Sequence, residues 1–132
     1  MVNFSYMHLP AYPLSESIDL IKKADRLGFY GAYSVDETWW KDMWLLFAAA
    51  AAGTTQIKMG PSVTHVILKY PTLIIQQLAT LDELSGGRAD MVVSFGNISL
   101  LAQYNEPWEG TRGSGGQTSA SCLRRSRRGA AA

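Results

Sequence analysis

The chain has 132 residues, 47% of them hydrophobic, which is the length of one domain with enough apolar side chains for a core, so a wholly disordered chain is excluded. The formal net charge is +1, but acidic side chains outnumber basic ones in residues 1–110, whereas residues 111–132 carry five arginines and no acid. We therefore predict one acidic domain followed by a basic segment of different character.

The domain opens with a predicted strand and helix. Apolar and small residues alternate over residues 3–8, which is typical of a short strand. Residues 15–27 then place their apolar side chains on one face, as a helix does, with Ser15 as the predicted N-cap. Gly28 suits the left-handed position that follows a helix.

The next segments repeat this alternation. Residues 30–35 predict a buried strand, the alanine- and leucine-rich residues 41–53 a helix, and residues 57–63 a third strand. Pro71 suits the first turn of a third helix, which a pair of glycines ends. Residues 89–95 predict a fourth strand, and residues 98–103 a short helix.

This order of elements predicts a parallel sheet with right-handed crossovers. A (β/α)8 TIM barrel and a doubly wound open sheet are the two candidate architectures. The loop after the first strand, residues 9–13, reads Leu-Pro-Ala-Tyr-Pro and lacks the glycines of a dinucleotide-binding turn. We therefore predict an α/β fold, an incomplete (β/α)8 TIM barrel of four βα units over residues 3–108.

Residues 109–132 have no hydrophobic period and are rich in glycine, serine and arginine, so we expect a disordered basic tail. Such a tail could contact nucleic acid or acidic lipid. The interpretation that we favour is a shifted reading frame of GC-rich coding sequence, because the change falls where a fifth βα unit should begin. Nucleic-acid binding by the tail is therefore not expected.

Cellular location has three weak indicators. Cys122 is the one cysteine, which excludes a disulfide within the chain and a cysteine metal cluster and suits a reducing compartment. The N-terminus lacks a signal-peptide pattern. The longest apolar run, residues 43–52, is shorter than the roughly 20 residues of a membrane span. We expect a cytoplasmic protein with no membrane segment.

One segment carries a family resemblance. Residues 78–88, Leu-Ala-Thr-Leu-Asp-Glu-Leu-Ser-Gly-Gly-Arg, resemble the signature of the luciferase-like monooxygenase superfamily, in which a helix ends in Ser-Gly-Gly-Arg before the fourth strand. Residues 57–64 resemble that superfamily's third strand, residues 70–72 its following helix start, and residues 28–37 its second strand. The match covers about residues 3–108.

Within the superfamily, residues 59–64, Met-Gly-Pro-Ser-Val-Thr, are most similar to the deazaflavin (coenzyme F-420) dependent reductases, such as methylenetetrahydromethanopterin reductase. In that branch the third strand has a non-proline cis peptide in a bulge that backs the deazaflavin ring. The resemblance implies a cis bond between Ser62 and Val63.

Barrels of this kind carry their chemistry at the carboxyl ends of the strands. A flavin or deazaflavin ring needs hydrogen bonds to its polar edge and an apolar shelf beneath it. By resemblance we predict that hydrogen bonds, shelf and close backbone approach come from the ends of the third and fourth strands. The predicted cofactor-binding residues are Ser62, Val63, Thr64, Ser94, Gly96 and Asn97.

The candidate catalytic residues are Asp36, Glu37 and His8. Asp36 matches the family's acidic position after the second strand, where it positions ring or substrate or handles protons; a helix cap or solvated carboxylate is the alternative. Glu37 stands where the family often has histidine, so it could move a proton if burial raises its pKa, or be a surface carboxylate. His8 points to the barrel mouth if strand alternation holds, or is a hydrogen-bonded core or rim histidine.

Other side chains have structural interpretations. His65 either lies near the cofactor or caps a turn, and Arg88 is structural, paired with Asp82 or Glu83. The tryptophans after the second strand cover the barrel mouth or a dimer contact, or pack in the core. Two histidines without a carboxylate cluster give no metal site.

The resemblance implies an oxidoreductase that transfers a hydride between coenzyme F-420 and a small organic substrate. The alternatives are an FMN-dependent luciferase-like monooxygenase and a non-catalytic half-barrel interaction module. A complete barrel needs about 250 residues, so we expect impaired activity from this chain. The resemblance also implies a homodimer formed through helices of this half.

Overall fold

The structure is a computed structural model that describes residues 2–104, so the predicted tail over residues 109–132 lies outside the described residues. Strands and helices alternate in the predicted order. They are β1 (Ser5–His8), α1 (Leu14–Arg26), β2 (Gly31–Ser34), α2 (Met43–Ala51), β3 (Lys58–His65), α3 (Pro71–Ser85), β4 (Val92–Ser94) and α4 (Ile98–Gln103).

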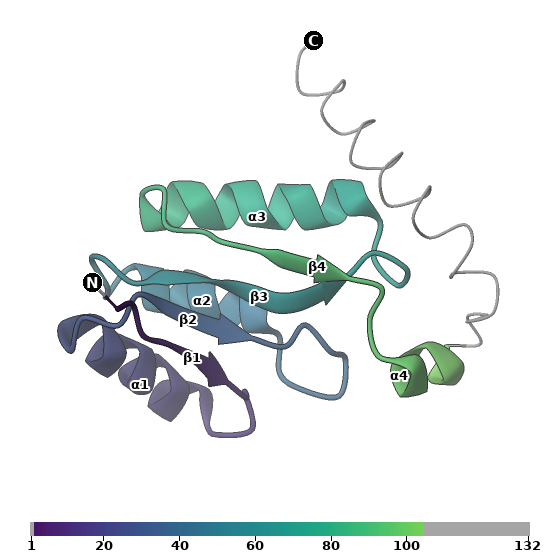
Figure 1. Ribbon diagram of the computed structural model, residues 1–132, viewed down its shortest axis with the longest axis horizontal. Helices are drawn as coiled ribbons and strands as arrows, with labels where there is room; N and C mark the ends of the chain where they lie inside the picture. The colour runs from purple at the N-terminus through teal and green to yellow at the C-terminus, as the bar shows by residue number, and fades with distance from the viewer. Residues whose placement is uncertain (1, 105–132) are drawn as a thin grey trace, which may run out of the picture.

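The four strands form one parallel sheet in the order β1-β2-β3-β4, so each strand pairs with its neighbour in sequence. Figure 1 shows α2 behind the sheet, with α1 along the β1 side and α3 along the β4 side. This progressive order, with one helix between successive strands, is the winding of a (β/α)8 barrel. In a doubly wound sheet the strand order would reverse at one point.

The helix boundaries follow local chemistry. The Asp42 side chain accepts a hydrogen bond from the Leu45 amide and caps α2, and Gly86 ends α3 in a left-handed conformation, as the sequence predicts. The prediction of Ser15 as the N-cap of α1 is wrong, because Pro13 occupies that position. The carbonyl of Pro13 already accepts from the Ser17 amide, so Ser15 lies inside the first turn.

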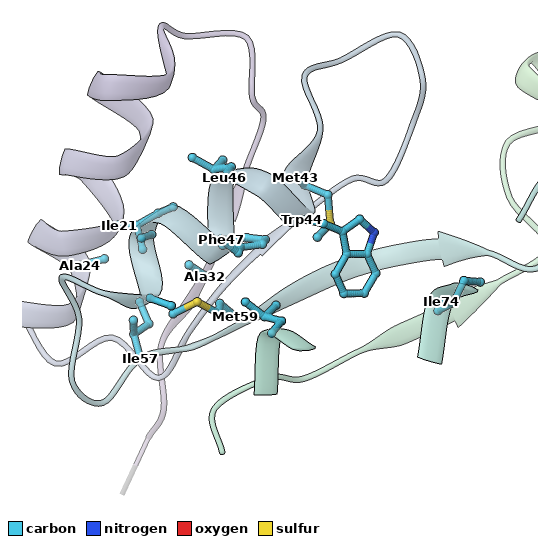
Figure 2. Close-up of a cluster of buried hydrophobic side chains, with 13 residues drawn as sticks. Ile21, Ala24, Ala32, Met43, Trp44, Leu46, Phe47, Ile57, Met59 and Ile74 are labelled. Atoms are coloured by element: carbon cyan, nitrogen blue, oxygen red, sulfur yellow. The ribbon is translucent and has the colours of Figure 1, made fainter. Parts of the chain in front are cut away.

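The core lies between the sheet and the helices (Figure 2). Ala32 of β2 and Met59 of β3 are register partners, and both are fully buried against the helices. Phe47 of α2 and Ile21 of α1 are also fully buried in this cluster. Side chains at alternate strand positions therefore face the helices, and those between them face the opposite, helix-free surface.

The helix-free surface carries a polar link across β3. The Tyr33 hydroxyl donates to the Asp90 carboxylate at 2.9 Å, which joins β2 to the start of β4 over Gly60. Burial, and then the hydrogen bond and charge of Asp90, raise the pKa of Tyr33 to about 12. Tyr33 therefore stays protonated as the donor at every pH at which the protein is handled.

Two charged side chains fasten the amino-terminal end of the sheet. Asp25 accepts from the backbone amides of Thr55, Gln56 and Ile57, and so ties the end of α1 to the start of β3. Arg88 is structural, as predicted, but its predicted pairing with Asp82 or Glu83 is wrong. Its guanidinium donates instead to Thr54 Oγ1, to the carbonyls of Ala51, Thr54 and Ile57, and to that of Ser85. Ala51 and Ser85 end α2 and α3, where helix carbonyls lack an intrahelical donor.

Across residues 2–104, no helix is both long enough and apolar enough to cross a membrane. The same residues contain no cluster of three histidine, cysteine, aspartate or glutamate side chains that could hold a metal ion.

Candidate functional site

Most of the predicted site residues lie at the carboxyl ends of β2, β3 and β4. Asp36 and Glu37 follow β2, Ser62, Val63 and Thr64 end β3, and Ser94, Gly96 and Asn97 lie at and after the end of β4. The parallel sheet brings these segments together, because all its strands end at the same edge.

Asp36 is the most heavily contacted of these residues. Its buried carboxylate accepts from Thr64 Oγ1 at 2.7 Å and from Trp44 Nε1 at 3.1 Å. The ammonium of Lys69 lies 2.6 Å from Oδ1 and 2.8 Å from Oδ2. Every contact stabilises the ionised carboxylate. Because its partners lie in β3, in α2 and in the loop between β3 and α3, the carboxylate joins these three segments.

The electrostatics of Asp36 follow from these contacts. Burial alone raises the pKa of a carboxyl group, but the hydrogen bond from Lys69, that from Thr64, and the charge of Lys69 outweigh it and hold the pKa of Asp36 below its usual value. Asp36 is therefore ionised at neutral pH. A carboxylate held in this way is a poor proton carrier, which favours a positioning role over the acid–base alternative.

Asp36 also contacts the irregular part of β3. The pairing of β3 with β4 shifts between Ser62 and Thr64, and we call residues 62–64 the β3 bulge. The peptide bond between Ser62 and Val63 is cis, as the sequence resemblance implied. The backbone amide of Asp36 donates to the Val63 carbonyl at 3.2 Å, while its carboxylate accepts from Thr64. One residue thus holds both ends of the Val63–Thr64 segment.

Glu37 and Asn97 meet across the same end of the sheet. Asn97 Nδ2 donates to Glu37 Oε1 at 3.2 Å. Two further bonds join the loop after β2 to α4: Tyr104 to Thr38 at 3.0 Å and Trp39 Nε1 to the Gln103 side chain at 2.6 Å. The structure therefore pairs a predicted catalytic residue with a predicted cofactor-binding residue, and places α4 beside that loop. Trp39 therefore lies at this end of the sheet, which is one of the positions that the sequence left open for the tryptophans after the second strand.

His8 lies on the face of the sheet that the helices cover. Its register partner is Ser34, and Tyr6, two residues earlier, pairs with the helix-facing Ala32. Its ring lies 6.2 Å from that of Tyr6 and 6.4 Å from that of Tyr12, beside α1. The prediction that His8 points into the mouth is therefore wrong, because the strand alternation has the opposite phase. Its Nε2 has no hydrogen-bond partner among the described residues, and burial lowers its pKa.

His65, rather than His8, is the histidine that lies on the helix-free face of the sheet. His65 pairs with Ser94 of β4. Met91 packs against the core, so Met91 and Val93 face the helices, and Ser94 with its partner His65 faces the helix-free surface. Its ring is buried, and neither ring nitrogen has a partner among residues 2–104. Gly96 lies against it, since a Cβ there would be 2.8 Å from the Cβ of His65. The left-handed glycine therefore lets the turn after β4 cover this histidine.

Lys69 and Trp44 are the site residues that the sequence did not reveal. Lys69 is a lone basic residue two positions before the Pro71 that starts α3, and Trp44 follows the α2 N-cap. Neither position carries a local pattern that points to Asp36. A possible signal was that a carboxylate at the end of a buried strand requires a cation, but the chain has five lysines and no local pattern selects Lys69 among them.

The progressive parallel sheet and its covering helices define the N-terminal part of a (β/α)8 barrel, with the candidate site residues at the carboxyl ends of the strands. The chain belongs to the luciferase-like monooxygenase family, whose model matches residues 2–112. This confirms the family that the sequence resembled.

Particular members are similar over most of the described chain. The 5,10-methylenetetrahydromethanopterin reductase of Methanopyrus kandleri is 34% identical over 81% of this chain and 31% of its own length. The solved coenzyme F-420 dependent reductase of that organism superposes with a TM-score of 0.77 at 30% identity, covering 81% of this chain and 31% of that one.

A more distant structure shares the fold. An F-420-dependent secondary alcohol dehydrogenase, solved with an F-420–acetone adduct, has a TM-score of 0.68 at 20% identity over 80% of this chain and 35% of its own. The predicted fold class is thereby confirmed. The chain spans about a third of the length of the curated relatives that it matches.

Proposed function

We propose that this chain supplies the ring-binding half of an oxidoreductase that transfers a hydride between coenzyme F-420 and a small organic substrate. The observation that carries the proposal is the β3 bulge, which pairs with β4 just before Ser94 at the carboxyl end of the sheet and is held by Asp36. Similarity to an F-420-dependent reductase supports the choice of cofactor.

The residues present suit the ring of such a cofactor. Ser62 and Ser94 are half-buried and have hydroxyl groups that can hydrogen-bond to a polar ring edge. Asn97 is also half-buried, but its side chain already bonds Glu37 and the Ser99 amide, so it has one amide hydrogen left for the ring. Val63 is half-buried and offers an apolar surface, and Gly96 lets the backbone approach closely. When bound, the cofactor supplies the hydride chemistry. The side chains of this chain orient the ring and exclude water from one side of it.

The described residues do not offer a phosphate site. Lys69 is paired with Asp36, and the ammonium of Lys41 donates to the carbonyls of Pro10, Ala11 and Tyr12. Neither lysine at this end of the sheet is therefore available to an anion without breaking these contacts. We infer that this chain binds the ring more strongly than it binds the phosphate, and that its affinity for a whole cofactor is low.

In this proposal Glu37 is the residue that handles protons. It is half-buried beside Asn97, whose amide fixes the direction of one carboxylate oxygen. Asp36 orients the β3 bulge. His8 has no part in the reaction, because it lies on the helix-covered face.

Cofactor binding is tested by titrating the chain with F-420 and with FMN and following the quenching of cofactor fluorescence. We expect Ser94→Ala to weaken binding roughly 2- to 10-fold, since one hydrogen bond contributes about 0.5–1.5 kcal/mol. Ser99→Ala is the matched control, because Ser99 is exposed on α4. Quenching by FMN alone would support the monooxygenase alternative, and quenching by neither would reject the function and favour an interaction module.

Self-association is a second expected property. Three leucines of α2 and α3, Leu45, Leu73 and Leu84, are more than half exposed to solvent. Exposed apolar side chains of this kind are expected on helices that pack against a second copy of the chain. Leu45→Glu should therefore shift sedimentation velocity profiles toward monomer, whereas Leu20→Glu on α1 should not. A wild-type chain that sediments as a monomer at all concentrations would contradict a homodimer.

A further inference from the structure

The strongest unassigned feature at this end of the sheet is the ion pair between Lys69 and Asp36. It is the one ion pair found among residues 2–104. The Asp36 carboxylate is 8% exposed and the Lys69 side chain 24%, so the pair is shielded from solvent. Buried ion pairs are costly to form, so one that persists calls for a structural or functional reason.

The surroundings of Asp36 explain why a cation is needed there. Trp44 of α2 and Thr64 of β3 meet the carboxylate as neutral donors, and Lys69 is the charged group among the described residues that faces it. Without the ammonium, a buried carboxylate would have two neutral hydrogen bonds against the full cost of leaving water. It would then take up a proton or move outward.

Either response would release the β3 bulge. A protonated Asp36 carries an O–H donor on one carboxyl oxygen, so it can no longer accept equally from Thr64, Trp44 and residue 69. If the outward movement carried the backbone of Asp36 with it, the bond from the Asp36 amide to the Val63 carbonyl would also break. The position of residues 62–64 thus depends on a lysine that lies outside the bulge, in the loop between β3 and α3.

We propose that Lys69 is a positioning residue, which holds the Asp36 carboxylate in place and through it fixes the Val63–Thr64 segment of the β3 bulge. Its consequence for cofactor binding rests on the proposed function, but its effect on the bulge does not. Lys69 lies two residues before Pro71, the first residue of α3.

The test uses the full chain and follows the Asp36 carboxyl carbon by NMR during an acid titration. In the wild type we expect the pKa of Asp36 below its ordinary value of 3.8. In Lys69→Met it should rise, because burial then opposes ionisation with less compensation. Lys69→Arg should restore the low value. Lys41→Met is the matched control, since Lys41 contacts only carbonyl oxygens among the described residues and should leave the pKa of Asp36 unchanged.

A second readout is amide hydrogen exchange at Asp36, whose N–H donates to Val63. Lys69→Met should accelerate it at least tenfold, and FMN or F-420 binding should weaken as the pH falls through the raised pKa of Asp36, while wild-type binding stays constant there. A loss of affinity that is equal at all pH values would indicate a merely structural role and overturn the proposal. So would unchanged exchange.

The two hypotheses fail separately. If Lys69→Met changes the pKa of Asp36 and the exchange rate but the wild type binds neither cofactor, the proposed function is rejected and the positioning role stands. If the wild type binds cofactor and Lys69→Met leaves all three quantities unchanged, the positioning role is rejected and the function stands.

Discussion

Replacing Gly60 with alanine is expected to destabilise the protein by about 3 kcal/mol, the upper end of the cost of overpacking. An added Cβ would lie 1.8 Å from the carbonyl oxygen of Asp90. That oxygen is backbone, so it cannot move aside as a flexible side chain would. Asp90 is also held by the hydrogen bond that its amide donates to the Met59 carbonyl and by the hydrogen bond that its carboxylate accepts from the Tyr33 hydroxyl. The start of β4 would therefore have to separate from β3.

Urea unfolding followed by circular dichroism measures this effect, and Gly53→Ala is the matched control. A Cβ at Gly53 would meet the end of the Lys22 side chain, which is free to rotate away. The control should therefore change the free energy of unfolding by less than about 0.5 kcal/mol, as surface substitutions do. Equal effects of the two substitutions would show that the close approach at Gly60 is not a constraint.

Replacing Asp25 with alanine should cost about 3 kcal/mol, because a buried amide left without an acceptor costs roughly 1–3 kcal/mol and the bond from the Ile57 amide is buried, whereas those from Thr55 and Gln56 are part-buried. The carboxylate accepts from three consecutive backbone amides, those of Thr55, Gln56 and Ile57, and from the Thr55 hydroxyl. Asp19→Ala on the exposed face of α1 is the control and should have little effect. Comparable losses in both variants would contradict this interpretation of Asp25.

The effect of Asp25 should depend on pH in a defined direction. Burial raises the pKa of this carboxyl group, but the bonds from the Gln56, Ile57 and Thr55 amides lower it more, so its folded-state pKa lies below the usual 3.8. The stabilisation is therefore complete above pH 3.8 and is lost as the pH falls through the folded-state pKa. The difference in stability between wild type and Asp25→Ala should shrink below pH 3.8 and stay constant between pH 5 and 8.

The sequence predicted the elements well wherever a local pattern carried the information. The apolar faces of α1 and α3 and the left-handed glycines Gly28 and Gly86 are short-range signals, and the structure has each in the predicted place. Ser15 was a wrong cap because Pro13 already supplied a backbone carbonyl in the right position. Helix caps depend on one or two residues of backbone geometry, which composition does not determine.

The sequence placed the candidate site residues at the carboxyl ends of the strands. The bulge at Ser62–Val63 and the group formed by Asp36, Glu37 and Asn97 lie where the sequence placed them, although their roles in binding and catalysis are still predictions. The strand ends could be named because a parallel sheet always brings them to one edge. Which face each side chain takes could not, because a shift of one residue in strand phase exchanges the two faces.

The sequence by itself determined the alternation of elements, the parallel sheet and the family, since these depend on hydrophobic period, on turn residues and on the segment over residues 78–88. Only the tertiary structure decided that His8 faces α1 while His65 lies under the turn at Gly96, and that Lys69 is the cation that pairs with Asp36. The physical reason is sequence separation. These contacts join residues up to 33 positions apart, as Lys69 and Asp36 are, and their geometry follows from how whole strands and loops pack rather than from any local pattern.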